Sequence, residues 1–198
     1  MNTSSPNLNL YQNDETFDQQ FSSRIQKLSK IHWSPLNIIK VAATFLSPQP
    51  GSKIIDIGSG AGKFCIAAAH YCPEAEFYGI EQRKNLYHIS QRLKKISRLS
   101  NVHFTHGDFT EINLKDYNGI YFFNSFAENL SSYGRIDNSI QYSPSLYNYY
   151  ANYLYKILEE KPIGTRLVTY HVDENEIPTS YRLTGSGFDQ KLKLLIKH

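Results

Sequence analysis

The order of apolar and polar positions along the chain predicts short strands that alternate with helices. Strand-like apolar runs lie at residues 53–57, 76–80, 101–107, 119–126, 165–172, 180–183 and 192–197. Helical spacing of apolar residues fills segments between them, at residues 63–71, about 83–98 and 145–160. This alternation predicts a doubly wound α/β fold, with a mainly parallel seven-stranded sheet, helices on both faces and an antiparallel terminal strand.

The N-terminal region has a different pattern. Residues 1 to about 15 are polar and predict a flexible tail. One short amphipathic helix is predicted next, from the helical spacing of Phe17, Phe21, Ile25 and Leu28. A second helix should follow, with Ser34 as its cap and Pro35 at its first position. We therefore expect a tail and short helix over residues 1–31, and a single domain over residues 32–198.

Composition limits the class of protein. A chain of 198 residues with 40% hydrophobic residues is long enough for one domain with a substantial core. No apolar run is long enough to span a bilayer, and the polar N-terminus lacks the layout of a secretory signal, so we expect a soluble, cytoplasmic protein. The net charge is only +3, and the basic residues of segment 83–98 are interpreted as the solvated face of a helix.

The two cysteines, Cys65 and Cys72, are predicted to lie on one helix. Seven residues of helix separate them by about 10 Å, which is beyond the reach of a disulfide. We interpret them as buried thiols in a reducing compartment, and we predict no metal site.

A glycine-rich turn follows the first predicted strand, in the stretch IIDIGSGAGKF at residues 54–64. In open α/β sheets, ligands bind beyond the carboxyl ends of the strands, beside such a turn. A nucleotide-binding P-loop is excluded, because its pattern would require glycine at Ile57 and a hydroxyl at Phe64.

A dinucleotide site is also disfavoured. The glycines Gly58, Gly60 and Gly62 do not have the G-x-G-x-x-G spacing of such sites. Asp56 precedes the turn, and its carboxylate would repel a pyrophosphate but attract a cationic group. The turn therefore indicates a ligand without phosphates.

The sequence has an acidic-x-G-x-G-x-G pattern, formed by Asp56, Gly58, Gly60 and Gly62. This pattern resembles the first motif of the class I S-adenosylmethionine-dependent methyltransferases. Further motifs agree in order: Glu81 ends the second strand in YGIEQ, Asp108 follows the third in HGDFTEI, and Asn124 follows the fourth in NSF. The resemblance covers about residues 32–198 and implies a Rossmann-like methyltransferase fold. It also implies S-adenosylmethionine as cofactor and S-adenosylhomocysteine as product.

The resemblance assigns roles to individual side chains. It places Glu81 on the ribose hydroxyls, Asp108 on the adenine amino group with Phe109 beside it, and Asn124 and Ser125 near the reacting methyl. The full set implied for cofactor binding is Asp56, Gly58, Ser59, Gly60, Gly62, Glu81, Asp108, Phe109 and Asn124. Structural alternatives exist, since Asp56 could cap a helix, Glu81 could be a surface acid and Asp108 could belong only to a turn.

Methyl transfer by in-line displacement depends mainly on alignment of the reactants and needs no obligatory acid or base. We take Asn124 and His171 as the candidate catalytic residues, and His32 as a second candidate base. The segment NSFAEN departs from the N-P-P-[YF] motif of amino-methylating members, since Ser125 and Phe126 replace the prolines. This departure disfavours DNA-base and glutamine-amide acceptors.

The acceptor itself is not predicted beyond a small molecule or a protein, with nucleic acid unlikely. The chain also resembles small bacterial methyltransferase-domain proteins of unknown acceptor. The long connection from about residue 130 to 145 is typical of a lid or of a wall of the acceptor site. Tyr133, Tyr142 and Tyr147 are interpreted either as the lining of an aromatic pocket or as ordinary packing or surface tyrosines. The alternative function is a non-catalytic protein of the same fold that binds S-adenosylmethionine or S-adenosylhomocysteine.

Overall fold

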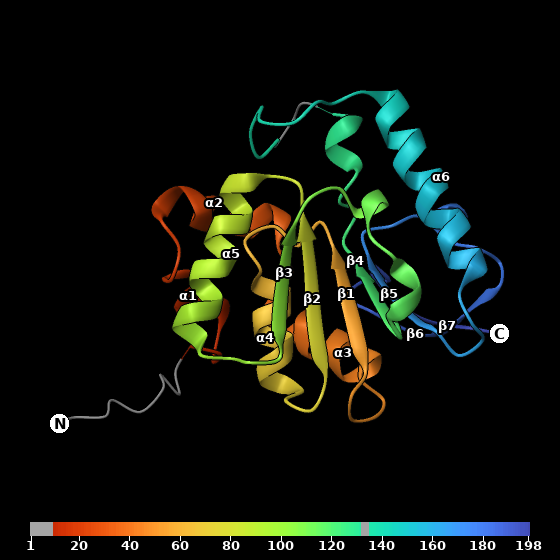
Figure 1. The fold of residues 1–198 in the computed structure, drawn as a ribbon, viewed down its shortest axis with the longest axis horizontal. Helices are drawn as coiled ribbons and strands as arrows, with labels where there is room; N and C mark the ends of the chain where they lie inside the picture. Colours follow the sequence, from red (N-terminus) through yellow and green to blue (C-terminus); the bar gives the residue numbers. More distant parts are fainter. Residues whose placement is uncertain (1–9, 132–134) are drawn as a thin grey trace.

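The computed structural model describes residues 10–131 and 135–198, and Figure 1 shows their arrangement. The α-helices are α1 (Asp14–Asp18), α2 (Ser23–His32), α3 (Leu36–Leu46), α4 (Lys63–Tyr71), α5 (Lys84–Ser97) and α6 (Pro144–Glu160). The strands are β1 (Lys53–Ile57), β2 (Glu76–Glu81), β3 (Val102–His106), β4 (Gly119–Phe122), β5 (Arg166–Tyr170), β6 (Tyr181–Gly187) and β7 (Leu192–Lys197). Short 3-10 helices are η1 (Phe109–Glu111), η2 (Leu114–Asp116), η3 (Ala127–Asn129) and η4 (Glu174–Glu176).

The strands form one seven-stranded sheet in the order β3-β2-β1-β4-β5-β7-β6. The pairs β1–β2, β1–β4, β2–β3 and β4–β5 are parallel, whereas β7 is antiparallel to both β5 and β6. This arrangement confirms the predicted fold class. It also brings the carboxyl ends of β1, β2 and β4 together at one edge of the sheet.

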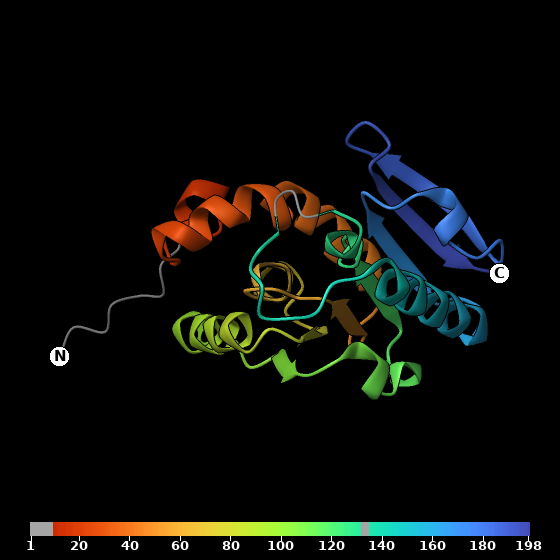
Figure 2. The ribbon, with the colours of Figure 1, turned by 90° about the horizontal axis from the view of Figure 1, so that it is seen from above.

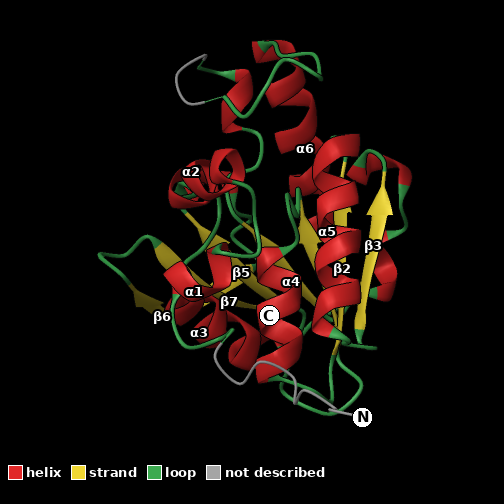
Figure 3. Ribbon diagram, turned by 90° about the vertical axis from the view of Figure 1, so that its left-hand side faces the viewer, coloured by secondary structure: helices red, strands yellow, loops and turns green. Residues whose placement is uncertain are grey.

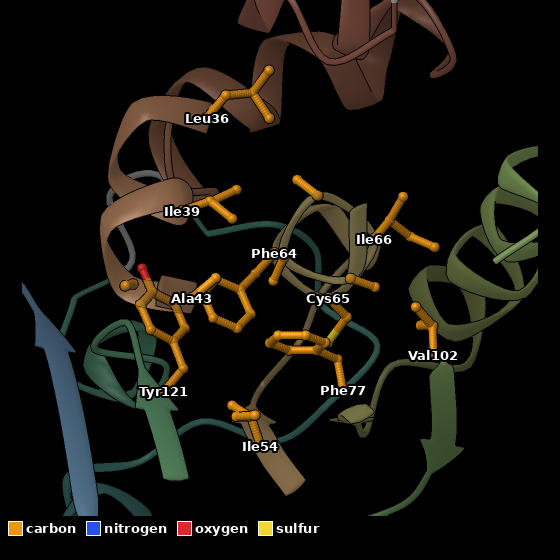
Figure 4. Packing of buried hydrophobic residues seen from close by; sticks show 14 of the residues in the cluster. Leu36, Ile39, Ala43, Ile54, Phe64, Cys65, Ile66, Phe77, Val102 and Tyr121 are labelled. Atoms are coloured by element: carbon orange, nitrogen blue, oxygen red, sulfur yellow. The ribbon is translucent and has the colours of Figure 1, made fainter. Parts of the chain in front are cut away.

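Helices cover both faces of the sheet. Strand β1 contributes to the cores on both faces, because successive residues of a strand point to opposite sides. Ile54 of β1 packs into a core with α3 and α4, and its neighbour Ile55 packs into a second core with α6. Figure 4 shows Ile54, Phe64, Phe77 and Tyr121 gathered in the first core. Figure 3 looks onto one face of the sheet, with α4 and α5 in front of the strands.

The boundaries of two strands differ from the expected ones by more than two residues. β4 ends at Phe122 instead of residue 126, because the backbone turns at Asn124, where φ is 35°. β6 continues through Gly187, although residues 184–187 lack apolar character, because their backbone pairs with β7. Pairing with a neighbouring strand therefore sets the length of β6 more than its own sequence does.

The N-terminal region forms two helices, α1 and α2, where one was expected. The side chain of Asn13 caps α1 by accepting from the Thr16 amide at 2.8 Å. Ordered packing begins before the expected helix, since Leu10 is buried and the Tyr11 ring stacks on His70 at 3.7 Å. The expected tail is therefore wrong for residues 10–15, because aromatic and apolar contacts hold them, and residues 1–9 lie outside the described part.

A buried lysine fixes these helices to the rest of the molecule. The Lys63 ammonium lies 2.7 Å from Asp14 Oδ1 and 2.8 Å from Asp18 Oδ1, and it lies 3.3 Å from Ser29 Oγ. The Lys63 side chain is only 2% exposed. Because Lys63 begins α4 directly after the glycine turn, these contacts join the N-terminal helices to that turn. The boundary expected at residue 31 stays a prediction.

The start of α3 also differs from the prediction. Pro35 occupies the N-cap position of α3, which has no side-chain cap. The Ser34 hydroxyl instead forms a short hydrogen bond with the Tyr121 hydroxyl at the end of the sheet. A buried hydroxyl partner therefore replaces the expected cap, since burial of an unpaired hydroxyl would be costly.

Two further sequence inferences concern the cysteines and membrane association. Both cysteines are free, and Cys65 is buried as predicted, but Cys72 is only half-buried. Across residues 10–131 and 135–198, no helix combines the length and the apolar character needed to cross a membrane.

We expect Lys63→Ala to lower the free energy of unfolding by about 3–5 kcal/mol, because it leaves the buried carboxylate of Asp18 without its cation. Denaturant unfolding measures the change. The control is Lys95→Ala, at an exposed position of α5, which should stay within about 0.5 kcal/mol of the unmodified protein. A change of less than about 1 kcal/mol for Lys63→Ala would show that the N-terminal helices do not depend on this ion pair.

Candidate functional site

A cavity of about 280 Å³ lies at the carboxyl edge of β1, β2 and β4. Figure 2 looks onto this edge and shows the connection between β4 and α6 passing across it, between the N-terminal helices and α5. Most of the residues expected from the sequence line this one cavity: Asp56, Gly58, Ser59, Gly60, Glu81, Asp108, Phe109, Asn124 and His171. Gly62 does not line the cavity, and a Cβ added there would meet Phe104 and Ser90 in the core.

The glycine turn brings bare backbone to the cavity. Gly58 has φ 75° and Gly60 has φ 55°, in the left-handed region that favours glycine. A Cβ at Gly58 would meet the Ser125 side chain, and a Cβ at Gly60 would meet the Trp33 indole. The amides of Gly58 and Ser59 both donate to the Ile80 carbonyl, at 3.0 and 2.9 Å, and so fix the turn against β2.

Glu81 ends β2 and is buried, with 4% of its side chain exposed. One carboxylate oxygen, Oε2, accepts from the Gly60 amide at 2.9 Å, and the other accepts from the Arg83 amide at 2.8 Å. Burial raises the pKa of Glu81, while these hydrogen bonds and the Arg83 charge oppose that rise. The surface-acid interpretation of Glu81 is therefore wrong, and its carboxylate is a fixed acceptor on the cavity wall.

Asp56 is also buried and lines the cavity. Burial, and then the nearby charge of Glu81, raise the pKa of Asp56 to about 8. The carboxyl group is therefore mostly protonated at pH 7, which differs from the anionic group expected from the sequence. A cation that entered this part of the cavity would favour its ionised form.

Asp108 belongs to a turn and also lines the cavity, so both interpretations made from the sequence apply to it. Its Oδ1 accepts from the amide and the hydroxyl of Thr110, both at 2.9 Å, and its Oδ2 accepts from the Tyr150 hydroxyl at 2.7 Å. Phe109 lies beside it with its ring stacked on Phe126 at 5.2 Å. Asp108 and Phe109 thus form a rigid wall that α6 supports through Tyr150.

The two candidate catalytic residues come from neighbouring strand ends. Asn124 follows β4 with φ 35°, and His171 follows β5 with φ 55°. Residues other than glycine seldom adopt such angles, and those that do cluster at functional sites. The His171 ring stacks on Phe123 at 5.6 Å, and burial, together with the charge of Lys191, lowers the pKa of His171. The imidazole is therefore mainly neutral at pH 7.

The N-terminal helices supply part of the cavity wall. His32 and Trp33, at the end of α2, both line the cavity, and Ser34 does so beside Tyr121. The position of Trp33 against Gly60 makes it a wall of the cavity, next to the glycine turn.

Sequence reasoning missed Arg83, which was interpreted as part of a solvated helix face. The guanidinium is 5% exposed and lies 2.5 Å from Glu128 Oε2 and 3.5 Å from Asp137 Oδ1. It also donates to the Tyr142 hydroxyl at 2.8 Å. One signal in the sequence could have identified Arg83, namely its position at the start of a predicted helix. A cation at that position is unfavourable unless other groups hold it there.

The expected tyrosine pocket is only partly present. Tyr142 lines the cavity, but the Tyr147 hydroxyl donates to Glu176 at 2.8 Å, and Tyr147 is not part of the lining. Tyr133 lies outside the described residues. Tyr147 is drawn away from the cavity because a carboxylate partner lies on η4.

The charges around the cavity limit what it can hold. Among the described residues, its lining includes four carboxyl groups, Asp56, Glu81, Asp108 and Glu128, and the guanidinium of Arg83, which is already ion-paired. Such a lining suits a ligand with hydrogen-bond donors and positive charge, and it disfavours a pyrophosphate. S-adenosylmethionine has this character, so the donor set fits the cofactor that the sequence resemblance implies. No cluster of metal-binding side chains occurs in the described part of the chain.

Comparison with known families agrees with this geometry. The model of a methyltransferase domain matches residues 48–149, slightly more than half of the chain, and the protein therefore belongs to this family. A ribosomal RNA small subunit methyltransferase A from Wigglesworthia glossinidia brevipalpis is 30% identical over 129 residues, which are 65% of this chain and 46% of that protein. A release factor glutamine methyltransferase from Aliivibrio fischeri is 30% identical over 80 residues, 40% of this chain and 28% of that protein. The chain thus spans less than half the length of these relatives.

Solved structures share the fold. An RNA methyltransferase from Salinibacter ruber, in complex with S-adenosylhomocysteine, matches 83% of this chain and 91% of its own, with a TM-score of 0.60 and 16% identity. TrmN from Thermus thermophilus matches 88% of this chain and 52% of its own, with a TM-score of 0.61 and 16% identity. At such low identity the likeness supports the fold alone.

The raised pKa of Asp56 predicts a pH-dependent loss of stability. The folded-state pKa, about 8, exceeds the ordinary value of 3.8, so the stability from Asp56 is fully present below about pH 3.8 and is lost as pH rises toward 8. We expect Asp56→Asn, which cannot ionise, to gain stability relative to the unmodified protein by about 1 kcal/mol per pH unit in this window.

Urea unfolding at pH 5 and pH 8 measures this difference. Glu160→Gln is the control, because Glu160 is exposed and its removal should give nearly the same difference at both pH values. A constant difference between Asp56→Asn and the unmodified protein would contradict the raised pKa.

Proposed function

We propose that this protein is an S-adenosylmethionine-dependent methyltransferase. One observation carries the proposal: the buried Glu81 carboxylate and the Gly60 backbone are joined by a hydrogen bond on the wall of a cavity whose lining includes four carboxyl groups. A buried acceptor beside exposed glycine backbone suits a ligand that brings hydroxyl donors and little negative charge. Membership of the methyltransferase domain family supports the same activity.

The lining suggests how the cofactor would be held. Glu81 would accept from the ribose hydroxyls, and Asp108 would accept from the adenine amino group through the lone pair that Tyr150 leaves on Oδ2. Asp56 and the glycine turn would receive the amino acid end. Entry of an ammonium group there would favour release of the Asp56 proton.

The bound cofactor supplies a methyl group on a positively charged sulfur. The chain has to place the acceptor in line with that methyl and to exclude water, and alignment alone is worth roughly 7–11 kcal/mol in favourable cases. Asn124 would orient the acceptor with its side-chain amide. The neutral His171 imidazole would take the proton of an oxygen or nitrogen acceptor.

The acceptor we propose is a small molecule or a protein side chain. The two curated relatives are named for different acceptors, RNA and a release factor glutamine, so their names do not select one. Four carboxyl groups around the cavity disfavour a polyanion such as RNA. Ser125 and Phe126, in place of two prolines, disfavour the glutamine amide.

Calorimetric titration tests cofactor identity. We expect S-adenosylmethionine and S-adenosylhomocysteine to bind and NAD, the control ligand, not to bind. Glu81→Ala should weaken both interactions by about 1.5–3 kcal/mol, because it removes charge-assisted hydrogen bonds. The matched variant is Glu76→Ala, at the opposite end of β2, where the carboxylate is 40% exposed and contacts His103.

An unchanged dissociation constant in Glu81→Ala would remove Glu81 from the site, and binding of NAD alone would contradict the proposed class. The alternative, a non-catalytic binding protein, predicts cofactor binding without turnover of any acceptor in a broad panel supplied with labelled S-adenosylmethionine.

For an oxygen or nitrogen acceptor found in that panel, we expect His171→Gln to lower kcat by about 10²–10⁴-fold. Its dissociation constant for S-adenosylhomocysteine should stay unchanged, because His171 is placed on the acceptor side. The readouts are initial rates across pH and calorimetric affinity. Equal rates in the two proteins would exclude His171 as the base.

A further inference from the structure

The connection between β4 and α6 closes the cavity with a defined stretch of chain. We call residues 135–143 the closing segment, all of which are described. Ile136, Ile140 and Tyr142 of this segment line the cavity. The segment lies over the carboxyl edge of the sheet in Figure 2. A ligand of this cavity is therefore covered by the closing segment.

One side chain makes the main charged contacts with this segment. Arg83 lies 3.5 Å from Asp137 Oδ1 through Nε, and it donates to the Tyr142 hydroxyl at 2.8 Å. Its ion pair with Glu128, at 2.5 Å, reaches the segment indirectly, since Glu128 Oε1 accepts from the Ile136 amide at 2.6 Å. The guanidinium thus contacts both ends of the segment and the η3 turn that precedes it.

The same residue is tied to the cofactor side of the cavity. The Arg83 amide donates to Glu81 Oε1 at 2.8 Å, and the guanidinium Nη1 lies 3.8 Å from that oxygen. Glu81 in turn holds the Gly60 amide. A continuous set of polar contacts therefore runs from the glycine turn, through Glu81 and Arg83, to the closing segment.

The position of Arg83 shows that these contacts decide where it lies. It occupies the N-cap of α5, where the helix dipole disfavours a cation, and it is almost completely buried. Burial of a guanidinium is costly unless carboxylates compensate it. Three carboxylates compensate the charge of Arg83. Two of them, Glu128 and Asp137, belong to the connection that covers the cavity.

We propose that Arg83 is a positioning residue that latches the closing segment over the cavity, and that release of this latch controls ligand entry and exit. The identity of the ligand, S-adenosylmethionine, rests on the proposed function, whereas the latch rests only on the contacts of Arg83. Opening requires the Arg83 contacts with Asp137 and Tyr142 to break. The ribose of a ligand bound at Glu81 would lie next to this latch and slow its release.

Limited trypsin digestion tests the latch without any ligand. Trypsin cuts after Arg135, at the start of the closing segment, where the side chain is half-buried and its Nε donates to the carbonyls of Glu128 and Ser131. We expect Arg83→Gln to speed this cut by about tenfold or more, the factor expected when charge-assisted hydrogen bonds are lost. Arg92→Gln, at an exposed position of α5, is the matched control.

A second variant keeps the test valid if Arg83→Gln fails to fold, which thermal unfolding would reveal. Tyr142→Phe leaves the ion pairs intact but removes the hydroxyl that accepts from Arg83 and donates to the Asp137 carbonyl at 2.6 Å. It should speed the cut at Arg135 by a smaller factor. A folded variant with the same rate of cutting as Arg92→Gln would overturn the latch.

Stopped-flow fluorescence tests the link to the ligand, because Trp33 is the single tryptophan and lines the cavity. We expect S-adenosylhomocysteine to leave Tyr142→Phe and Arg83→Gln faster than it leaves the unmodified protein and Arg92→Gln. Equal dissociation rates would overturn control of ligand exit by the latch. Absence of binding to the unmodified protein would overturn the proposed function, and trypsin digestion would still decide the latch.

Discussion

The site depends on the hydrogen bonds that the carboxylate of Glu81 accepts. This carboxylate is buried at the end of β2 and must find donors, since a buried charge without partners is costly. The Gly60 amide and the Arg83 amide supply them. Together with the bonds that the Gly58 and Ser59 amides donate to the Ile80 carbonyl, the bond from the Gly60 amide holds the glycine turn against β2. The bond from the Arg83 amide also ties the start of α5 to the same strand end.

The local pattern of apolar and polar residues was sufficient to predict most of the fold. The helix predicted at residues 63–71 and the strand at 53–57 have the observed bounds, because their apolar periodicity agrees with the burial of both faces. The errors lie where partners decide the structure. β6 is extended by its pairing with β7, and the N-terminal chain forms two helices, both of which contact the distant Lys63, α1 through Asp14 and Asp18 and α2 through Ser29.

The candidate site was predictable to the extent that topology brings strand ends together. Acids placed at or near the carboxyl ends of β1, β2 and β3 had to meet at one edge once those strands were parallel, and Asp56, Glu81 and Asp108 do line one cavity. Their binding roles stay predictions. The partners of Arg83 on the connection between β4 and α6 could not be predicted, because Glu128 and Tyr142 lie 45 and 59 positions away along the chain and no local periodicity encodes such a contact.

The strand order has a consequence for how the sheet is completed. β7 lies between β5 and β6 although it follows both in the sequence. During synthesis, β5 therefore keeps one unpaired edge until residues 192–197 have emerged, and β6 has no partner until then. An open strand edge is a template for pairing with another chain. The nascent protein is thus most exposed to misassembly just before its last strand arrives, at a stage when the cavity-forming strands can already be in place.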